Sequence, residues 1–268
     1  MDVSLPLTKG ASPSRADAAD SKVAIPQYRR RAILAVWAAA ALPMAALAWL
    51  VAPVLEDHLG GEENVPMAKA LLICLTVGLI WQFVLVAVLV WREQGKLSWP
   101  VVREALWLRS PRNPRSGRVG GRVWLIVIPL ILLFAAEGAI RALPAPEDRD
   151  LGEFVSSDAG KDFFSGAWGW FGLIIVAQIF NTVLGEELLF RGLLLPRMNG
   201  VFGRGDWVAN GVLFAAYHLH APWVIPVTLL DTFTLALPSK YFRSAWMGIV
   251  VHGAQSLFII ILILTLVL

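Results

Sequence analysis

The sequence predicts an all-α fold: a polytopic transmembrane helix bundle with about seven membrane helices. Hydrophobic residues make up 57% of the 268 residues and charged residues only 16%, whereas a soluble domain carries about 25% charged residues. The mean hydropathy is +0.65, and twelve tryptophans are typical of the aromatic belts of membrane proteins. Membrane-spanning strands are excluded, because the apolar runs are continuous and lack a period of two.

The N-terminal stretch is polar and lacks the apolar core of a signal peptide. It closes with three consecutive arginines, Arg29, Arg30 and Arg31, which suit a position at the membrane surface. We expect residues 1–31 to form a disordered cytoplasmic tail.

The apolar runs divide the remaining chain into membrane helices. A helix needs about 20 apolar residues to cross the bilayer core, and the runs 31–55, 67–91 and 123–143 meet that length. A fourth run begins near residue 166 and passes through Glu186. Two shorter runs, 207–221 and 222–238, contain polar residues, and the last run covers 245–268. We expect helices one to three and their loops over 32–165, and a separate core over 166–268.

The loop charges orient these helices. Residues 92–122 carry eight Lys and Arg against two Glu, whereas the loops 56–65 and 145–165 are mainly acidic. Because basic loops stay on the cytoplasmic side, we expect a multi-pass plasma-membrane protein, bacterial in character, with a cytoplasmic N-terminus. The net charge of +3 needs no nucleic-acid partner. The C-terminus falls on the far side unless the fifth and sixth helices form a re-entrant hairpin.

Ionisable side chains within the apolar runs are costly in lipid and therefore point to function. Glu187 and Arg191 are four residues apart and can pair on one helix face, as can Glu137 and Arg141. Glu186 lies about 100° around the helix from Glu187, which leaves it without a partner in its own helix. The Glu137–Arg141 pair is interpreted as structural or interfacial.

Three histidines lie in later apolar runs. His218 and His220 are two apart, so we expect them to point to nearly opposite sides of a helix, with only one facing a given site. His252 lies in the middle of the last helix. Two imidazoles and the Glu186 carboxylate make a zinc ligand set with an open position for water. Without metal, Glu could act as base and His as acid or oxyanion donor.

These residues resemble the motifs of the CPBP intramembrane metalloproteases, which include the CAAX prenyl endopeptidases and bacterial self-immunity proteins. "EELLFR" (186–191) is similar to the family's Glu-Glu-x-x-x-Arg, and "FAAYH" (214–218) to its Phe-x-x-x-His. "HGAQS" (252–256) is similar to its final motif, with Ser256 where asparagine is more usual. The resemblance covers about residues 166–260.

The resemblance implies roles for the matching residues. Glu186 would activate water. His218 would bind that water or the metal, and His252 would bind the metal or steady the oxyanion; the metal, Zn²⁺, would be held by Glu186, His218 and His252. Glu187, Arg191 and Ser256 would shape the site. We expect the site between helices four, five and seven, opening towards the cytoplasm. The substrate would be a membrane-associated peptide or protein, lipidated or hydrophobic. Two alternatives stay open: an inactive or non-enzymatic immunity or scaffold protein, and a transporter or proton relay.

Two polar residues have no place in these motifs. His220 is interpreted as interfacial. Asp231 is interpreted as hydrogen bonded to a neighbouring helix, with orientation of a histidine as the alternative.

Overall fold

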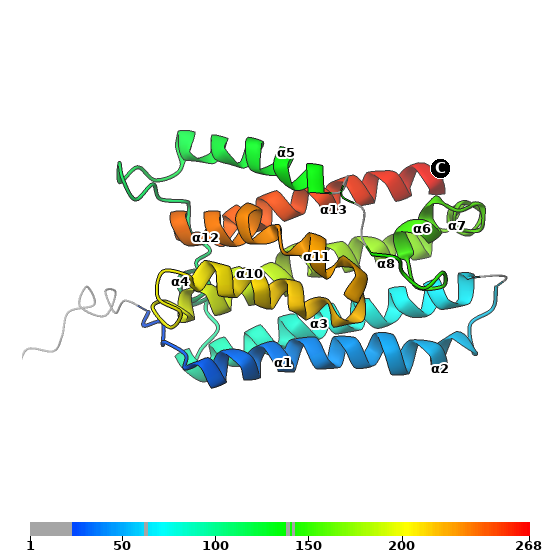
Figure 1. Cartoon of the computed structure of the whole chain (residues 1–268), viewed down its shortest axis with the longest axis horizontal. Helices are drawn as coiled ribbons and strands as arrows, with labels where there is room; N and C mark the ends of the chain where they lie inside the picture. The colour runs from blue at the N-terminus through cyan, green and yellow to red at the C-terminus, as the bar shows by residue number, and fades with distance from the viewer. Residues whose placement is uncertain (1–22, 62–63, 138–139, 141–142) are drawn as a thin grey trace, which may run out of the picture.

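The fold is an elongated helical bundle (Figure 1). The computed structural model describes residues 23–268 apart from 62–63, 138–139 and 141–142. Within these residues the regular structure is helical, with extended pairing limited to two isolated bridges. All-α architecture is therefore confirmed.

The N-terminal half of the bundle is a pair of long helices. The first comprises α1 (Arg30–Ala46), a π-helical turn (Leu47–Val51) and α2 (Ala52–Glu56), and it packs along α3 (Val65–Gln94). Gly78 of α3 makes this close packing possible, since a Cβ there would stand 2.5 Å from the Met44 sulfur. Both helices are apolar on nearly all faces, as lipid exposure requires.

The catalytic candidates lie on two further long helices and on the elements between them. The third long helix comprises α8 (Trp168–Ile179), two π-helical segments (Phe180–Gly185 and Leu188–Leu194) and α9 (Leu195–Arg197); the fourth is α13 (Trp246–Val267). Between them in the chain lie α10 (Asp206–Tyr217), the 3₁₀ turns His218–His220 and Pro222–Val224, α11 (Ile225–Thr228), the π-helical turn Thr232–Ala236 and α12 (Leu237–Phe242).

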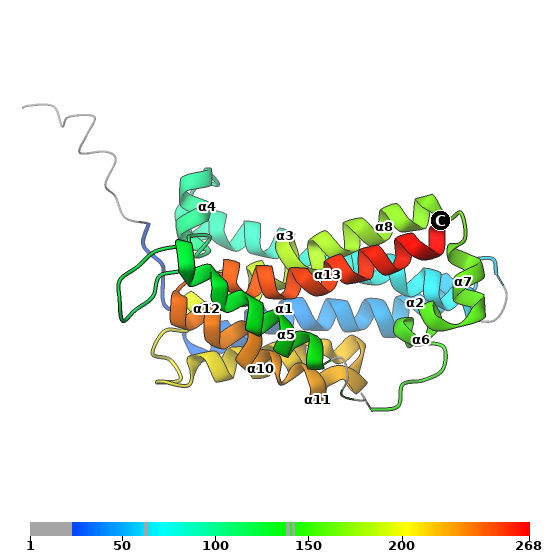
Figure 2. The same ribbon diagram turned by 90° about the horizontal axis from the view of Figure 1, so that it is seen from above.

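The remaining elements connect or flank this core. α4 (Trp99–Ala105) precedes a 3₁₀ turn (Gly121–Ile126) and α5 (Val127–Glu137), and α6 (Leu151–Ser156) and α7 (Asp158–Phe164) precede α8. α5 lies against α13 at the edge of the bundle (Figures 1 and 2). Most of its side chains are exposed, whereas Phe134 and Glu137 are buried.

The two ends of the bundle differ in charge. Figure 1 shows α4, the start of α10 and the end of α12 at one end, and α2, α6, α7 and the C-terminus at the other. The 92–122 segment, which is rich in Lys and Arg and contains α4, lies at the first end, and the mainly acidic 145–165 segment, which contains α6 and α7, lies at the second. Successive long segments run in alternating directions between these ends, as the alternation of loop charges predicts.

Among the residues that the structure describes, four helices are long and apolar enough to cross a membrane: Arg30–Glu56, Val65–Gln94, Trp168–Arg197 and Trp246–Val267. The other three predicted crossings are shorter as helices. The 123–143 run is helical as α5 only from Val127, and the 222–238 run is broken into short pieces at Pro222 and Pro226, since proline lacks the N–H that continues a helix. The count of seven stays a prediction.

The predicted tail is described only from Val23 onwards. Its last residues pack on the bundle: the Tyr28 amide donates to the Arg197 carbonyl at 2.9 Å, and the Tyr28 hydroxyl contacts the Glu93 carboxylate. Val23 and Ile25 pack against the core cluster. The segment just before α1 is therefore fixed to the ends of α3 and α9.

Candidate active site

The two adjacent glutamates lie where the third long helix departs from α-helical geometry. Glu186 and Glu187 stand between the π-helical segments 180–185 and 188–194. Such insertions are frequent at functional sites, because they turn side chains out of the regular register. Gly185 precedes them and packs closely on α3, since a Cβ there would stand 3.1 Å from the Leu79 carbonyl oxygen. Both carboxylates are consequently deep inside the bundle.

Glu187 joins two of the predicted site residues. Its Oε1 lies 3.1 Å from Arg191 Nη1 and 3.1 Å from His252 Nδ1. The predicted pairing of Glu187 with Arg191 is therefore present. The bond to His252, which comes from the distant helix α13, could not be predicted from spacing. Glu187 and Arg191 are both completely buried, so each needs the other to offset its desolvation.

Phe214 explains the aromatic residue of the second motif. Its ring lies 4.0 Å beneath the Arg191 guanidinium, a cation–π contact that is strong when desolvated. The same ring meets His218 edge-on at 5.1 Å and His252 at 6.3 Å between centroids. Phe214 thus holds the arginine and both imidazoles in one cluster.

His218 and His220 lie closer together than predicted. α10 ends at Tyr217 and a 3₁₀ turn follows, so the α-helical spacing does not apply. Their rings are 5.3 Å apart, and the expectation of opposite directions is wrong for this reason. His218 Nδ1 lies 3.0 Å from the Phe214 carbonyl oxygen. The His218 side chain lines a pocket together with Glu186 and His252, whereas His220 does not line it.

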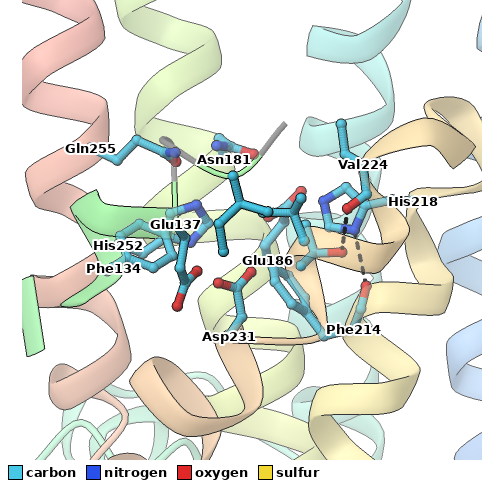
Figure 3. Close-up of a pocket in the computed structure, with 13 residues that line it drawn as sticks. Phe134, Glu137, Asn181, Glu186, Phe214, His218, Val224, Asp231, His252 and Gln255 are labelled. Atoms are coloured by element: carbon cyan, nitrogen blue, oxygen red, sulfur yellow. Dashed lines mark hydrogen bonds between the residues drawn. The ribbon is translucent and has the colours of Figure 1, made fainter. Parts of the chain in front are cut away.

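A pocket of about 290 Å³ gathers the catalytic candidates. Glu186, His218 and His252 all line it, and Figure 3 shows their side chains directed towards a common space. They come from the third long helix, the end of α10 and α13, which correspond to predicted helices four, five and seven. Glu187 and Arg191 are not among the lining residues and support the site from behind.

A chain of hydrogen-bonding side chains positions Glu186. The Tyr217 hydroxyl is within hydrogen-bonding reach of the Glu186 carboxylate, and Gln82 Nε2 donates to that hydroxyl at 2.6 Å. Because the amide occupies the oxygen as acceptor, the tyrosine proton remains for Glu186. Tyr217 and Gln82 were missed by sequence reasoning. Tyr217 stands next to His218, and Gln82 is a polar residue within an apolar run.

The pocket also contains two acids that the motifs do not include. Glu137 and Asp231 point into it from α5 and from the turn before the π-helical segment 232–236 (Figure 3). The Thr234 hydroxyl lies 3.4 Å from Glu137. The interfacial interpretation of Glu137 is wrong, because the side chain is buried against α13 and this turn; Arg141, its predicted partner, lies outside the described residues. Asp231 meets Glu137 of another helix, as its preferred interpretation predicts.

Of the final motif, 252–256, only some residues reach the pocket. The Ser256 hydroxyl donates to Gln178 Oε1 at 2.6 Å and does not line the pocket. Gln255, the residue before it, lines the pocket together with Asn181. Figure 3 places both amides on one side of the pocket. Gln255 therefore presents an amide to the site where Ser256 does not.

The hydrogen bonds of His218 and His252 indicate which ring nitrogens are available to bind a metal ion. A carbonyl oxygen can only accept, so His218 Nδ1 carries the hydrogen and the neutral ring keeps its Nε2 lone pair. His252 Nδ1, facing a carboxylate, has the arrangement typical of a metal-binding histidine. Yet within the described residues no group of three or more His, Cys, Asp or Glu is arranged to hold a metal. The donor types and the tautomer of His218 fit zinc.

The lining residues Ile140, Val224 and Val227 lie after α5 and around α11. The expected opening of the site towards the cytoplasm stays a prediction.

Comparison with known proteins bears on this same segment. Neither the curated proteins nor the solved structures include a match to the chain. Among family models, the one for Rce1-like type II CAAX prenyl endopeptidases matches residues 168–258. This segment contains both glutamates, Arg191, both histidines of the pocket and Ser256. The match to the type II CAAX prenyl endopeptidase family over residues 168–258 confirms the resemblance that the motifs predicted.

Proposed function

We propose that the protein is an intramembrane endopeptidase of the CAAX-protease kind, with Glu186 as the base that activates water. The observation that carries the proposal is that Glu186 shares one buried pocket with His218 and His252, while Arg191 is engaged by Glu187 instead. A carboxylate left free among imidazoles and beside a cavity suits proton abstraction from a bound water.

The remaining groups have distinct tasks in this mechanism. Glu187 positions His252, and Phe214 holds His218 against the same cluster. Without a metal ion, His218 Nε2 accepts a hydrogen bond from the attacking water. The amides of Asn181 and Gln255 can donate to the developing oxyanion, which the neutral ring of His218 cannot do. Glu186 then returns the proton to the leaving amine.

We further propose that zinc is the natural occupant of this pocket. With zinc bound, His218 and His252 would hold it through Nε2, in place of the contact with water, and Glu186 through one carboxylate oxygen. This would leave a position for water on the ion and the second Glu186 oxygen for the proton of that water. The ion would supply Lewis-acid polarisation of the scissile carbonyl.

The substrate is proposed to enter from the membrane. A second cavity of about 330 Å³, lined by apolar residues of α5 and α13, shares Phe134 and Gln255 with the catalytic pocket. A hydrophobic or lipidated segment would lie in this cavity and present its peptide bond to Glu186.

The charged ends of the bundle support a multi-pass plasma-membrane protein with the basic end in the cytoplasm.

The test is peptide cleavage by the full chain in nanodiscs, followed by mass spectrometry. The probes are prenylated and unprenylated peptides that end in a CAAX-type sequence. Glu186→Gln should reduce kcat about 10²- to 10⁴-fold with the fold retained. Glu153→Gln, an exposed acid on α6, is the matched control and should cleave normally. If wild type and Glu186→Gln gave equal amounts of cleaved peptide, the proposal of an endopeptidase with Glu186 as base would be wrong, and an immunity or scaffold role would be favoured.

A further inference from the structure

A separate pocket, of about 360 Å³, is formed by residues of α4, of the segment after it and of the end of α12, and it shares no lining residue with the catalytic pocket. Four arginines line it: Arg103 of α4, Arg109, Arg112, and Arg243 after α12. A single carboxylate, Glu104, is among the lining residues, 3.5 Å from Arg109. In the described part of the chain the other three arginines have no ion pair. The pocket therefore offers several uncompensated guanidinium groups to one ligand.

The backbone around this pocket is fixed. The Arg112 amide donates to the Phe242 carbonyl at 3.0 Å, and the Ala245 amide donates to the Trp107 carbonyl at 3.0 Å. Arg109 Nε adds a bond to the Arg243 carbonyl at 3.1 Å. The segments after α4 and after α12 are therefore held together, although they are distant in sequence.

Two residues at this junction have unusual backbone conformations. Trp107 has φ of 51° and Arg243 has φ of 49°, and among the described residues other than glycine no others have positive φ. Such conformations persist only where the surroundings impose them, and they cluster at binding sites. Here they turn Arg109 and Arg243 towards the same space.

The charges in the pocket oppose one another. Burial lowers the pKa of Arg109; Glu104 raises it, and the nearby guanidinium groups of Arg243 and Arg112 lower it further. An anion in the pocket would relieve this repulsion. Phosphate oxygens suit a cluster of guanidinium groups best, because each fork of N–H donors can grip two of them.

An apolar groove adjoins the arginine pocket. Val123, Leu125, Ile126 and Pro129 supply its apolar lining, and Asn113, Arg122 and Phe242 also line it. Asn113 and Phe242 directly neighbour Arg112 and Arg243 in the chain, so the two cavities meet beside the hairpin that the bridge between Arg112 and Val119 closes. Leu125 and Ile126 are exposed and end the 3₁₀ turn that leads into α5, where lipid chains are expected.

From the adjoining cationic pocket and apolar groove, we propose that this end of the protein binds an anionic phospholipid. The headgroup phosphate lies among Arg103, Arg109, Arg112 and Arg243, and an acyl chain lies along Leu125 and Ile126. Basic pockets of this kind at a membrane surface are known to select anionic headgroups. A free phosphate shares the headgroup chemistry but leaves the groove empty.

The test is native mass spectrometry of the full chain in detergent, titrated with phosphatidylglycerol, phosphatidylcholine of the same acyl chains, or inorganic phosphate. Arg103→Gln with Arg112→Gln removes two exposed pocket arginines and should weaken phosphatidylglycerol binding about 30-fold. The matched control is Arg115→Gln with Arg118→Gln, on the same hairpin but outside the pocket, which should change affinity less than about twofold.

Two further variants keep the test decisive. Arg243→Asn removes a guanidinium while retaining a residue that tolerates positive φ, and should weaken binding in the same direction. Leu125→Ser should weaken binding of phosphatidylglycerol but not of inorganic phosphate. If the pocket variant and the control variant lost equal affinity for phosphatidylglycerol, the lipid would be bound by diffuse surface charge and the proposed site would be wrong. Equal affinity for phosphatidylcholine, or for inorganic phosphate, would overturn the assignment of an anionic phospholipid.

Discussion

Glu187 accepts a hydrogen bond from His252 Nδ1 at 3.1 Å, linking the third long helix to the middle of α13. The same oxygen faces Arg191, so one buried carboxylate both orients the imidazole and neutralises the guanidinium. The pair joins residues 65 positions apart in the sequence. It makes the geometry of the pocket depend on a group that does not line it.

The Glu187–Arg191 pair should show strong thermodynamic coupling. Glu187→Gln leaves a buried guanidinium without its anion and should destabilise the protein by about 3–5 kcal/mol. Removing both charges, with Glu187→Gln and Arg191→Met, should cost less than the sum of the single changes. Thermal unfolding in detergent measures the cycle. Additive costs would mean that the two side chains do not depend on each other.

Gly248 should tolerate no side chain. A Cβ at this position would stand 2.1 Å from Glu187 Oε2, so Gly248→Ala must displace the carboxylate that holds His252. We expect a large loss of stability and, where the protein folds, a fall in kcat of about 10- to 100-fold, as for loss of a group that orients a metal-binding histidine.

Gly253 on the same helix is the matched control, because nothing lies within 4 Å of its Cβ position. Gly253→Ala should be neutral or slightly stabilising, since alanine is the better helix former. Equal behaviour of the two variants in unfolding and cleavage assays would show that contact with Glu187 does not constrain α13.

Zinc content should depend on the pocket histidines. Elemental analysis of the purified protein should find zinc close to one per chain, and His218→Ala should lose most of it because one imidazole ligand disappears. His58→Ala, in the loop after α2, should retain the metal. Zinc in neither the wild type nor the control would leave Glu186 and the amides to act without it.

Arg197 should be essential for packing at the basic end. It is completely buried, pairs with Glu93, and donates to the carbonyls of Ala105 and Leu193 at 3.0 and 2.9 Å. Arg197→Met should destabilise by about 3–5 kcal/mol, because Glu93 and two carbonyls lose their partner. Differential scanning fluorimetry measures the change in Tm.

A surface pair provides the comparison for Arg197. Asp158 and Lys161 lie 2.9 Å apart on α7, and the Asp158 side chain is almost fully exposed. Asp158→Asn should leave Tm unchanged, since solvent already screens this pair. If Asp158→Asn lowered Tm as much as Arg197→Met does, burial of the ion pair would not be the reason for its contribution to stability.

The sequence by itself determined the class of the fold and the chemical identity of the site. Continuous apolar runs predict helices in lipid because no other backbone arrangement satisfies its own hydrogen bonds there. The four-residue spacing of Glu187 and Arg191 predicted their contact. It left Glu186 unpaired, and Glu186 does line the pocket.

The tertiary structure decided what depends on contacts between distant segments. No helical spacing links Glu187 to His252, Tyr217 to Gln82, or Glu137 to Asp231, since each pair meets only when separate helices pack. The 3₁₀ turn after Tyr217 and the π-helical segments beside Glu186 also changed the register that regular helices would impose. Local sequence fixes which groups are buried, whereas packing decides which of them face one another.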